Sequence, residues 1–280
     1  MRYVDLHVHS NASDGTLTPT EVVELAIQKN LAAIALSDHD TVKGVSEAIQ
    51  AAKGSDLEVI PATELSCYYQ GIEIHVLGLF VDHQNKEFLD ALDQLEEARK
   101  KRNLDMLALF QQDGIHITLE DLQAGNPSSV ITRAHFARAL VQKGVCKDKD
   151  TAFRRYLGIG CPYYLPKPQV TPEQSLPMIT KAGGIPILAH PMLYKLGHRQ
   201  VEELVQYLIH LGLKGIEAYH SSCNPSQSDK LRSLAIQYGL AISGGSDFHG
   251  ANKPDIQIGS GRGGLRITEA VLEELRKYQN

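Results

Sequence analysis

Cysteine and long apolar runs are both scarce in this chain of 280 residues. The cysteines are scattered without any C-x-x-C pair, at positions Cys67, Cys146, Cys161 and Cys223. This spacing argues against a disulfide framework and against a thiolate zinc site. No stretch approaches the roughly 18 apolar residues that span a bilayer, and the N-terminus lacks the basic start and apolar run of a signal peptide. We therefore expect a cytoplasmic protein with reduced thiols and no membrane partner.

A strong net charge is also missing, because 28 basic residues face 33 acidic ones and the net charge is only −5. Such a balance creates no global field that would attract duplex nucleic acid or an acidic membrane, so an anionic ligand must be held locally. No G-x-S-x-G elbow and no Walker A loop are present. Residues 259–264 read GSGRGG, but no βαβ unit follows them, and we interpret them as a turn rather than a nucleotide-binding loop.

Short β-rich apolar runs alternate with helical patterns along most of the chain. The predicted strands lie near residue 3 and at 31–37, 57–61, 74–80, 185–190, 215–219 and 240–243. Such alternation predicts an α/β fold with a parallel sheet, and about seven strands favour a closed βα barrel over an open sheet. Helix starts are indicated where Thr18 precedes Pro19 and Thr171 precedes Pro172.

One region interrupts this alternation, because residues 85–165 show only helical spacing. We interpret it as a helical insertion that could cover the barrel as a lid. The segment CPYYLPKPQVTPEQ would then return the chain to the main domain. The predicted division is a barrel domain of residues 1–84 and 166–280 with an insertion of residues 85–165.

Side chains of the kind that bind metal ions fall at the ends of the predicted strands. They are His7, His9, Asp14, His39, Glu64, His75, His190, Asp247 and His249. The loops that follow barrel strands build one site, so residues far apart in sequence can share it. A single histidine at a strand end is more often an ordinary polar group than a ligand. Nine ionisable groups buried together without a cation would, however, be strongly destabilising, and the set suits two or three divalent ions, Mn, Fe or Zn.

The motifs around these residues resemble the polymerase and histidinol phosphatase (PHP) family of metal-dependent phosphoesterases. They are HVHS at 7–10, SDHD at 37–40, ATELS at 62–66, His75, AHP at 189–191 and SDFH at 246–249. The resemblance spans nearly the whole chain and implies a distorted seven-stranded, TIM-like βα barrel in which metal-bound hydroxide attacks phosphorus.

The resemblance also implies how the ligands are divided among the ions. His7, His9, Glu64 and Asp247 would surround one ion, and Glu64 would bridge to a second ion held by His75 and His190. Asp14, His39 and His249 would hold a third. Asp14, His39, Glu64 and Asp247 are the expected catalytic residues, and Asp38 and Asp40 are expected to orient the ring of His39.

Residues in the predicted insertion suggest which phosphoester is cleaved. Arg102, Asn103, Arg133 and His135 resemble the branch that acts on nucleoside 3′,5′-bisphosphates and short 5′-phosphorylated oligonucleotides, where they would bind a second phosphate. Lys100 and Lys101 are interpreted as a solvated face. The tyrosine pairs at 68–69 and 163–164 could stack a base but are more often packing residues.

His220 follows a predicted strand and points toward the same rim, which makes it a candidate proton donor or substrate contact. The leading hypothesis is therefore a phosphoesterase acting on small nucleotides rather than on duplex nucleic acid. A histidinol phosphatase, a metal-dependent amidohydrolase and a non-catalytic metal-binding accessory domain are the alternatives.

Overall fold

Seven strands form one sheet in the order in which they occur along the chain. The computed structural model describes residues 2–123, 126–127, 129–166 and 170–279. The strands are β1 (Tyr3–Val8), β2 (Leu31–Leu36), β3 (Glu58–Tyr69), β4 (Ile72–Leu79), β5 (Ile185–Leu188), β6 (Gly215–His220) and β7 (Ala241–Gly245). A bridge between Val8 and Phe248 joins β1 to the segment after β7. The sheet is therefore a nearly closed barrel, and the predicted seven-stranded α/β barrel is confirmed.

The expectation that all strands run parallel is wrong for β4, which is antiparallel to both β3 and β5. The cause is a two-residue turn in which Gln70 has φ 49° and Gly71 has φ 80°. Positive φ at both central positions is the geometry that joins antiparallel strands in a tight hairpin. β3 also continues eight residues past the predicted end at residue 61, to Tyr69.

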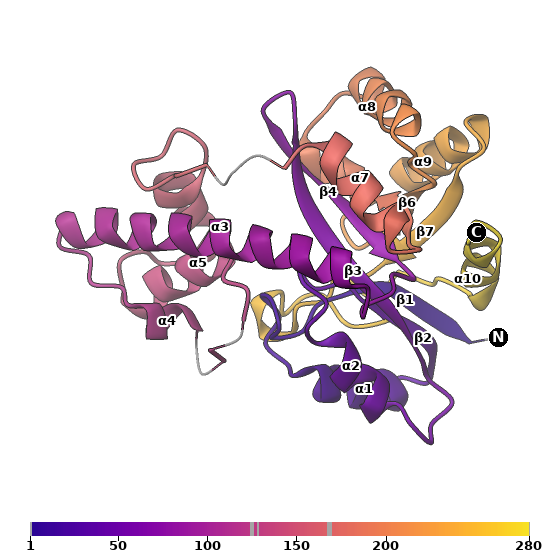
Figure 1. The fold of residues 1–280 in the computed structure, drawn as a ribbon, viewed down its shortest axis with the longest axis horizontal. Helices are drawn as coiled ribbons and strands as arrows, with labels where there is room; N and C mark the ends of the chain where they lie inside the picture. Colours follow the sequence, from indigo (N-terminus) through magenta and orange to yellow (C-terminus); the bar gives the residue numbers. More distant parts are fainter. Residues whose placement is uncertain (1, 124–125, 128, 167–169, 280) are drawn as a thin grey trace.

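Helices cover the outside of the barrel. They are α1 (Pro19–Gln28), α2 (Val45–Ala51), α7 (Pro172–Lys181), α8 (His198–His210), α9 (Pro225–Gln237) and α10 (Glu269–Arg276), with short 3-10 turns η2 (Pro191–Tyr194) and η3 (Gly250–Asn252). Figure 1 shows α1 and α2 on one side of the sheet and α7, α8 and α9 on the other. The predicted starts of α1 and α7 are confirmed, with Thr18 and Thr171 as N-caps before Pro19 and Pro172.

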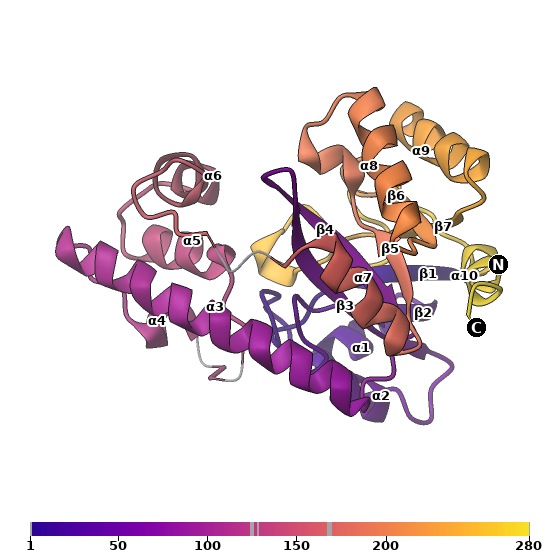
Figure 2. The ribbon, with the colours of Figure 1, turned by 45° about the horizontal axis from the view of Figure 1, so that its top comes forward.

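The helical segment, as we call residues 85–165, projects from the barrel between β4 and α7. It comprises α3 (Lys86–Gln112), α4 (Leu119–Gln123), α5 (Arg133–Gln142), α6 (Lys149–Ala152) and the π-helical turn η1 (Phe153–Leu157), and its described residues contain no strand. These helices pack around an apolar core that includes Met106, Phe110 and Phe136. Figures 1 and 2 show the segment beside one end of the barrel. Its role as a separate lid domain stays a prediction, and residues 167–169 of the expected return path lie outside the described residues.

The glycine-rich turn at 259–264 packs against the barrel. Gly259 has φ 75°, and its N–H donates to Oδ2 of the buried Asp5 on β1 over 2.7 Å. Within the described residues this turn lies between η3 and α10 and joins no strand to a helix, so the turn interpretation is confirmed and no βαβ nucleotide-binding loop forms here. Among the cysteines, Cys67 is buried, and Cys146, Cys161 and Cys223 are partly exposed. In the part of the chain that the structure describes, no helix is long and apolar enough to cross a membrane.

Candidate metal centre

The structure brings all nine predicted ligands together at one end of the barrel. Each lies in, or within four residues after, one of the strands β1, β2, β3, β4, β5 and β7, apart from Asp14, which is farther along the loop after β1. With His220, they form four groups of three or four residues whose ligand atoms lie within 4.8 Å of one another. The parallel strands end at this rim, while Glu64 and His75 are contributed from within the β3–β4 hairpin. The fold therefore converts scattered residues into one cluster.

Glu64 lies at the middle of the cluster and is completely buried. Its Oε1 atom is 2.8 Å from Nδ1 of His75 and 2.7 Å from Nε2 of His190. Its Oε2 atom lies within 3.3 Å of ring nitrogens of three further histidines, His7, His9 and His39. Burial alone would raise the pKa of Glu64, but the nearby imidazoles hold it well below its usual value. The carboxylate therefore has the position required to bridge two cations.

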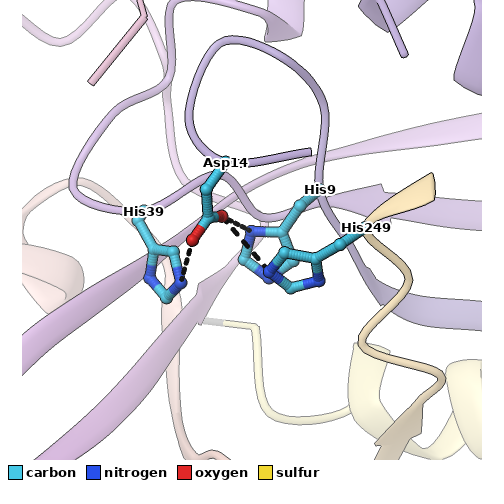
Figure 3. A group of neighbouring side chains, drawn as sticks. All are labelled: His9, Asp14, His39 and His249. Atoms are coloured by element: carbon cyan, nitrogen blue, oxygen red, sulfur yellow. Dashed lines mark ion pairs between the residues drawn. The ribbon is translucent and has the colours of Figure 1, made fainter. Parts of the chain in front are cut away.

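Asp14 is the centre of a second group, drawn in Figure 3 with His9, His39 and His249. Asp14 Oδ1 is 3.2 Å from Nε2 of His249 and 3.9 Å from Nδ1 of His9, and Oδ2 is 3.7 Å from Nε2 of His39. Asp14 Oδ1 and His9 Nδ1 are buried and have no hydrogen-bond partner among the described residues. Lone-pair atoms that lack a hydrogen-bond donor and face one point are what a bound cation would explain.

Asp247 divides its two oxygens between the cluster and a pair of outer donors. Oδ1 lies 3.5 Å from Nε2 of His9 and 3.4 Å from Nδ1 of His249. Oδ2 is 2.6 Å from Nζ of Lys253 and 3.5 Å from Nε2 of His220. Lys253 was not predicted from the sequence, because a lysine four residues after the SDFH motif gives no signal of its own.

Hydrogen bonds behind the cluster determine which ring nitrogens can bind a metal. His7 Nδ1 donates to the buried Glu217 over 2.9 Å, which leaves the lone pair of Nε2 directed into the cluster. His220 differs, because its Nδ1 accepts from the backbone N–H of Ser222. Its Nε2 lies 3.5 Å from Asp247 Oδ2 and has no hydrogen-bond partner among the described residues. Glu217 was also missed, although an acidic residue inside the apolar strand GIEAY was an available signal.

Asp38 and Asp40 do not contact the ring of His39, so their expected role is wrong. Asp38 instead accepts hydrogen bonds from the backbone and hydroxyl of Ser10 and from the hydroxyl of Ser13. Burial raises the pKa of Asp38 to about 6. Asp40 accepts from the N–H of Ser66 and forms an ion pair with Arg99. Asp38 therefore holds the loop that precedes Asp14, and Asp40 anchors α3 through Arg99.

A cavity of about 160 Å³ opens beside the cluster, between His39 and His75 of the barrel and the helical segment. Its wall includes the arginine cluster, which we define as Arg99, Arg102 and Arg133. The first residues of α5 also line it, and helix N-termini favour anions. Arg99 was not among the predicted site residues. The cavity is thus suited to an anionic group next to the cluster.

The three guanidinium groups differ in their partners. Arg133 pairs with Glu73 and lies over the ring of Tyr164 at 5.5 Å. Arg102 is only 4% exposed, and its Nε and Nη2 atoms have no hydrogen-bond partner among the described residues. Burial, reinforced by repulsion from Arg133, lowers the pKa of Arg102 to about 10. A buried cation in this state is stabilised when an anion enters the cavity.

Two predicted substrate residues lie elsewhere. His135 accepts from the N–H of Thr132 through Nδ1 over 3.0 Å and so completes the cap of α5 instead of lining the cavity. Asn103 donates to the carbonyl of Ile131 over 3.1 Å and borders a different cavity. Among the tyrosine pairs, Tyr163 stacks on Phe110 with ring centroids 3.9 Å apart, which agrees with packing.

The donor set fits divalent metal ions. Imidazole nitrogens and carboxylate oxygens suit Mn, Fe and Zn, and no cysteine takes part. Buried atoms without a hydrogen-bond partner among the described residues occur around both Glu64 and Asp14. They include Glu64 Oε2, His39 Nδ1 and Asp14 Oδ1. A single ion could not satisfy so many ligands at normal coordination distances.

Comparison with known proteins agrees with this geometry. The family model for the PHP domain matches residues 5–108. A 3′,5′-nucleoside bisphosphate phosphatase from Chromobacterium violaceum is 34% identical over 92% of this chain and 91% of its own length. A 5′-3′ exoribonuclease from Haemophilus influenzae is 36% identical over 88% of this chain and 89% of its own.

A solved structure is also similar across the whole chain. It is that of a Bifidobacterium adolescentis protein assigned to the metal-dependent phosphoesterases, and its TM-score is 0.86 at 30% identity. The match covers 99% of this chain and 96% of the other. The similarity therefore includes the barrel and the helical segment.

Proposed function

The chain belongs to the PHP domain family, and on this premise we propose that it is a metal-dependent phosphoesterase that acts on small nucleotides. The proposed substrates are nucleoside 3′,5′-bisphosphates and short 5′-phosphorylated oligonucleotides. The observation that carries this proposal is the arginine cluster beside the candidate metal centre, in which two guanidinium nitrogens of Arg102 have no hydrogen-bond partner among the described residues. A substrate with two phosphates can place one at each position.

Two or three divalent ions, Mn, Fe or Zn, would be held by the nine ligands of the cluster. Glu64 would bridge two of them, and the group around Asp14 would hold the third. Bound divalent cations activate water at neutral pH and neutralise charge on a phosphoryl group. Asp14, His39, Glu64 and Asp247 are the proposed catalytic residues, because they are ligands of the same centre next to the cavity.

The remaining residues of the site position the substrate and the ligands. Arg102, Arg133 and the N-terminus of α5 would bind the second phosphate, since guanidinium groups and helix N-termini both favour phosphate oxygens. Glu217 would orient His7, and His220, whose Nε2 lies 3.5 Å from Asp247 Oδ2, would contact Asp247 from outside the cluster. The wall formed by the helical segment favours a small substrate over a duplex.

The alternatives fit the site less well. Histidinol phosphate carries a single phosphate, and amide hydrolysis requires no phosphate at all, so neither explains the arginine cluster. A non-catalytic accessory domain would not need a complete set of gathered ligands, and all nine are present in this chain.

A substrate panel tests the proposal directly. The protein is stripped with a chelator, restored with Mn²⁺, and assayed with adenosine 3′,5′-bisphosphate, a 5′-phosphorylated trinucleotide, histidinol phosphate and an aryl phosphate. We expect activity only after Mn²⁺ is restored and the highest kcat/KM on the first two substrates. Arg133→Ala should reduce kcat/KM for the bisphosphate far more than for the aryl phosphate. Preference for histidinol phosphate, or equal losses on both substrates, would contradict the proposal.

A further inference from the structure

The loop that carries Asp14 is held by the helical segment as well as by the barrel. Four hydrogen bonds connect residues 11–14, which we call the Asp14 loop, to residues 126–132. Asn126 Nδ2 donates to the carbonyl of Asn11 over 2.7 Å, and the backbone N–H of Val130 donates to the carbonyl of Ala12 over 2.9 Å. Ser129 Oγ donates to the carbonyl of Ser13 over 2.5 Å, and Thr132 Oγ1 donates to the carboxylate of Asp14 over 3.0 Å. Every residue of the loop therefore has a contact with the helical segment.

The contact made by Thr132 is the one that reaches a proposed metal ligand. Its Oγ1 accepts from the N–H of Ala134 over 3.1 Å as the N-cap of α5, so its single proton remains available to donate. Asp14 Oδ2 receives that proton over 3.0 Å, while Oδ1 faces His249. The hydroxyl therefore fixes the rotation of the Asp14 carboxylate. Thr132 is 8% exposed, so little water competes for this bond.

The same turn of α5 also borders the phosphate side of the site. Thr132, Arg133 and Ala134 all line the cavity that holds the arginine cluster. An anion bound there would contact residues adjacent to the hydroxyl that positions Asp14. Rigid backbone over one helical turn thus connects the two halves of the site.

We propose that Thr132 is a positioning residue that makes the helical segment part of the metal centre. By orienting Asp14, it raises the affinity for the ion held among His9, Asp14, His39 and His249. Because an anion in the cavity holds the N-terminal turn of α5 in place, phosphate and this ion bind cooperatively. The inference rests on the proposed function, since it concerns the same site.

Metal binding by the stripped protein tests the inference without any measurement of activity. Mn²⁺ is titrated into the full chain by calorimetry, with and without inorganic phosphate. Loss of a partner that orients a ligand typically weakens metal binding by about 10–100-fold. We therefore expect Thr132→Val to lower the affinity for the most weakly bound Mn²⁺ ion by at least about tenfold and to abolish the increase in that affinity caused by phosphate. Thr132→Ser should restore both the affinity and its increase with phosphate.

The control is Thr118→Val. Thr118 Oγ1 accepts from the N–H of Asp121 at the start of α4, in the same helical segment, but Thr118 is exposed and its recorded contacts do not involve the cluster. This variant should lose a similar cap without altering the Mn²⁺ titration. Ser129→Ala removes a second contact to the Asp14 loop, together with the 3.4 Å contact between Ser129 Oγ and Nε2 of His135, and it should weaken the same ion to a smaller degree. It provides the test if Thr132→Val does not fold.

The outcomes separate this inference from the proposed function. If wild-type protein binds several Mn²⁺ ions and Thr132→Val or Ser129→Ala binds them equally well, the inference is wrong and the proposed function stands. Equal weakening by Thr118→Val would also overturn it, because the effect would then come from helix stability. If wild-type protein binds no divalent ion, the proposed function fails together with the inference.

Discussion

Replacing Arg102 should raise the free energy of unfolding of the protein and weaken its binding of the substrate. Arg102 is buried, and two of its guanidinium nitrogens have no hydrogen-bond partner among the described residues. Burial, and then repulsion from Arg133, lowers its pKa from 12.5 to about 10. A shift of this size corresponds to roughly 3 kcal/mol of unfavourable free energy for the charged form. Arg102→Met keeps much of the volume without the charge, so the free energy of unfolding should rise by about 1–3 kcal/mol.

Arg99→Met is the matched variant, one turn earlier on α3 and on the wall of the same cavity. Burial lowers the pKa of Arg99 too, to about 9, but Arg99 differs from Arg102 because it forms a buried ion pair with Asp40, and both side chains are about 5% exposed or less. Removal of one partner from a buried pair leaves the other charge uncompensated and typically destabilises a protein by about 3–5 kcal/mol. Two substitutions of the same type on one helix should therefore change stability in opposite directions.

The assay combines denaturant unfolding of the metal-free variants with kinetics of the Mn²⁺-loaded enzymes. A hydrogen-bonded guanidinium–phosphate contact contributes about 1.5–3 kcal/mol, so Arg102→Met should raise KM for adenosine 3′,5′-bisphosphate by roughly 10–150-fold. KM for an aryl phosphate should change little. The reasoning is refuted if Arg102→Met destabilises the protein as Arg99→Met does, or if KM for the bisphosphate is unchanged.

Three further predictions concern the surroundings of the cluster. Glu217→Gln should lower Mn²⁺ affinity by about 10–100-fold, measured by metal content after dialysis, because Glu217 orients His7. The control Glu203→Gln, at an exposed position, should leave the metal content unchanged. An unaffected metal content in Glu217→Gln would exclude the orienting role of Glu217. Burial lowers the pKa of His75, but Glu64 and Glu73 raise it to about 9, so metal-free protein should lose stability as pH rises from about 6.5 to 9. Thermal unfolding across that range should be flatter for His75→Gln, and an identical slope would show that another group titrates. Glu73→Gln should free Arg133 and lower KM for the bisphosphate several-fold in steady-state assays, whereas a raised KM would mean that Glu73 holds Arg133 in its working position.

The ligands could be predicted from the sequence because strand ends converge in any barrel. His7 and His9 are two residues apart and point to the same side of β1, and the motif positions of His190 and Asp247 mark the ends of two other strands. Residues behind the ligands were harder to predict. Asp38 adjoins His39 in sequence, yet its carboxylate faces Ser10 and Ser13 because the chain turns sharply after β2.

Contacts between the helical segment and the barrel were the least predictable part of the site. His135 lies in a motif with Arg133, but its ring accepts a hydrogen bond from the N–H of Thr132, because this N–H at the start of α5 has no acceptor within the helix. Arg99 precedes Lys100 and Lys101, which were interpreted as a solvated face, yet its ion pair with Asp40 is buried. Helical periodicity indicates which residues share a face but not which surface that face meets.

Backbone strain at the cluster explains why local sequence could not specify its final geometry. Asp40, His190 and Asp247 lie two to four residues after the ends of β2, β5 and β7 and have φ values of 53°, 28° and 59°. Such conformations are unfavourable for residues other than glycine, typically by about 1–3 kcal/mol each, and persist only where the surrounding structure enforces them. Here each strained N–H is held by the site itself: Asp40 donates to the carbonyl of Glu64, His190 to the carboxylate of Glu217 and Asp247 to the carbonyl of His7. The ligands and their neighbours thus hold each other's backbone conformation through bonds between different strand–loop segments. The geometry of the cluster is therefore fixed by the assembled barrel and not by any single segment.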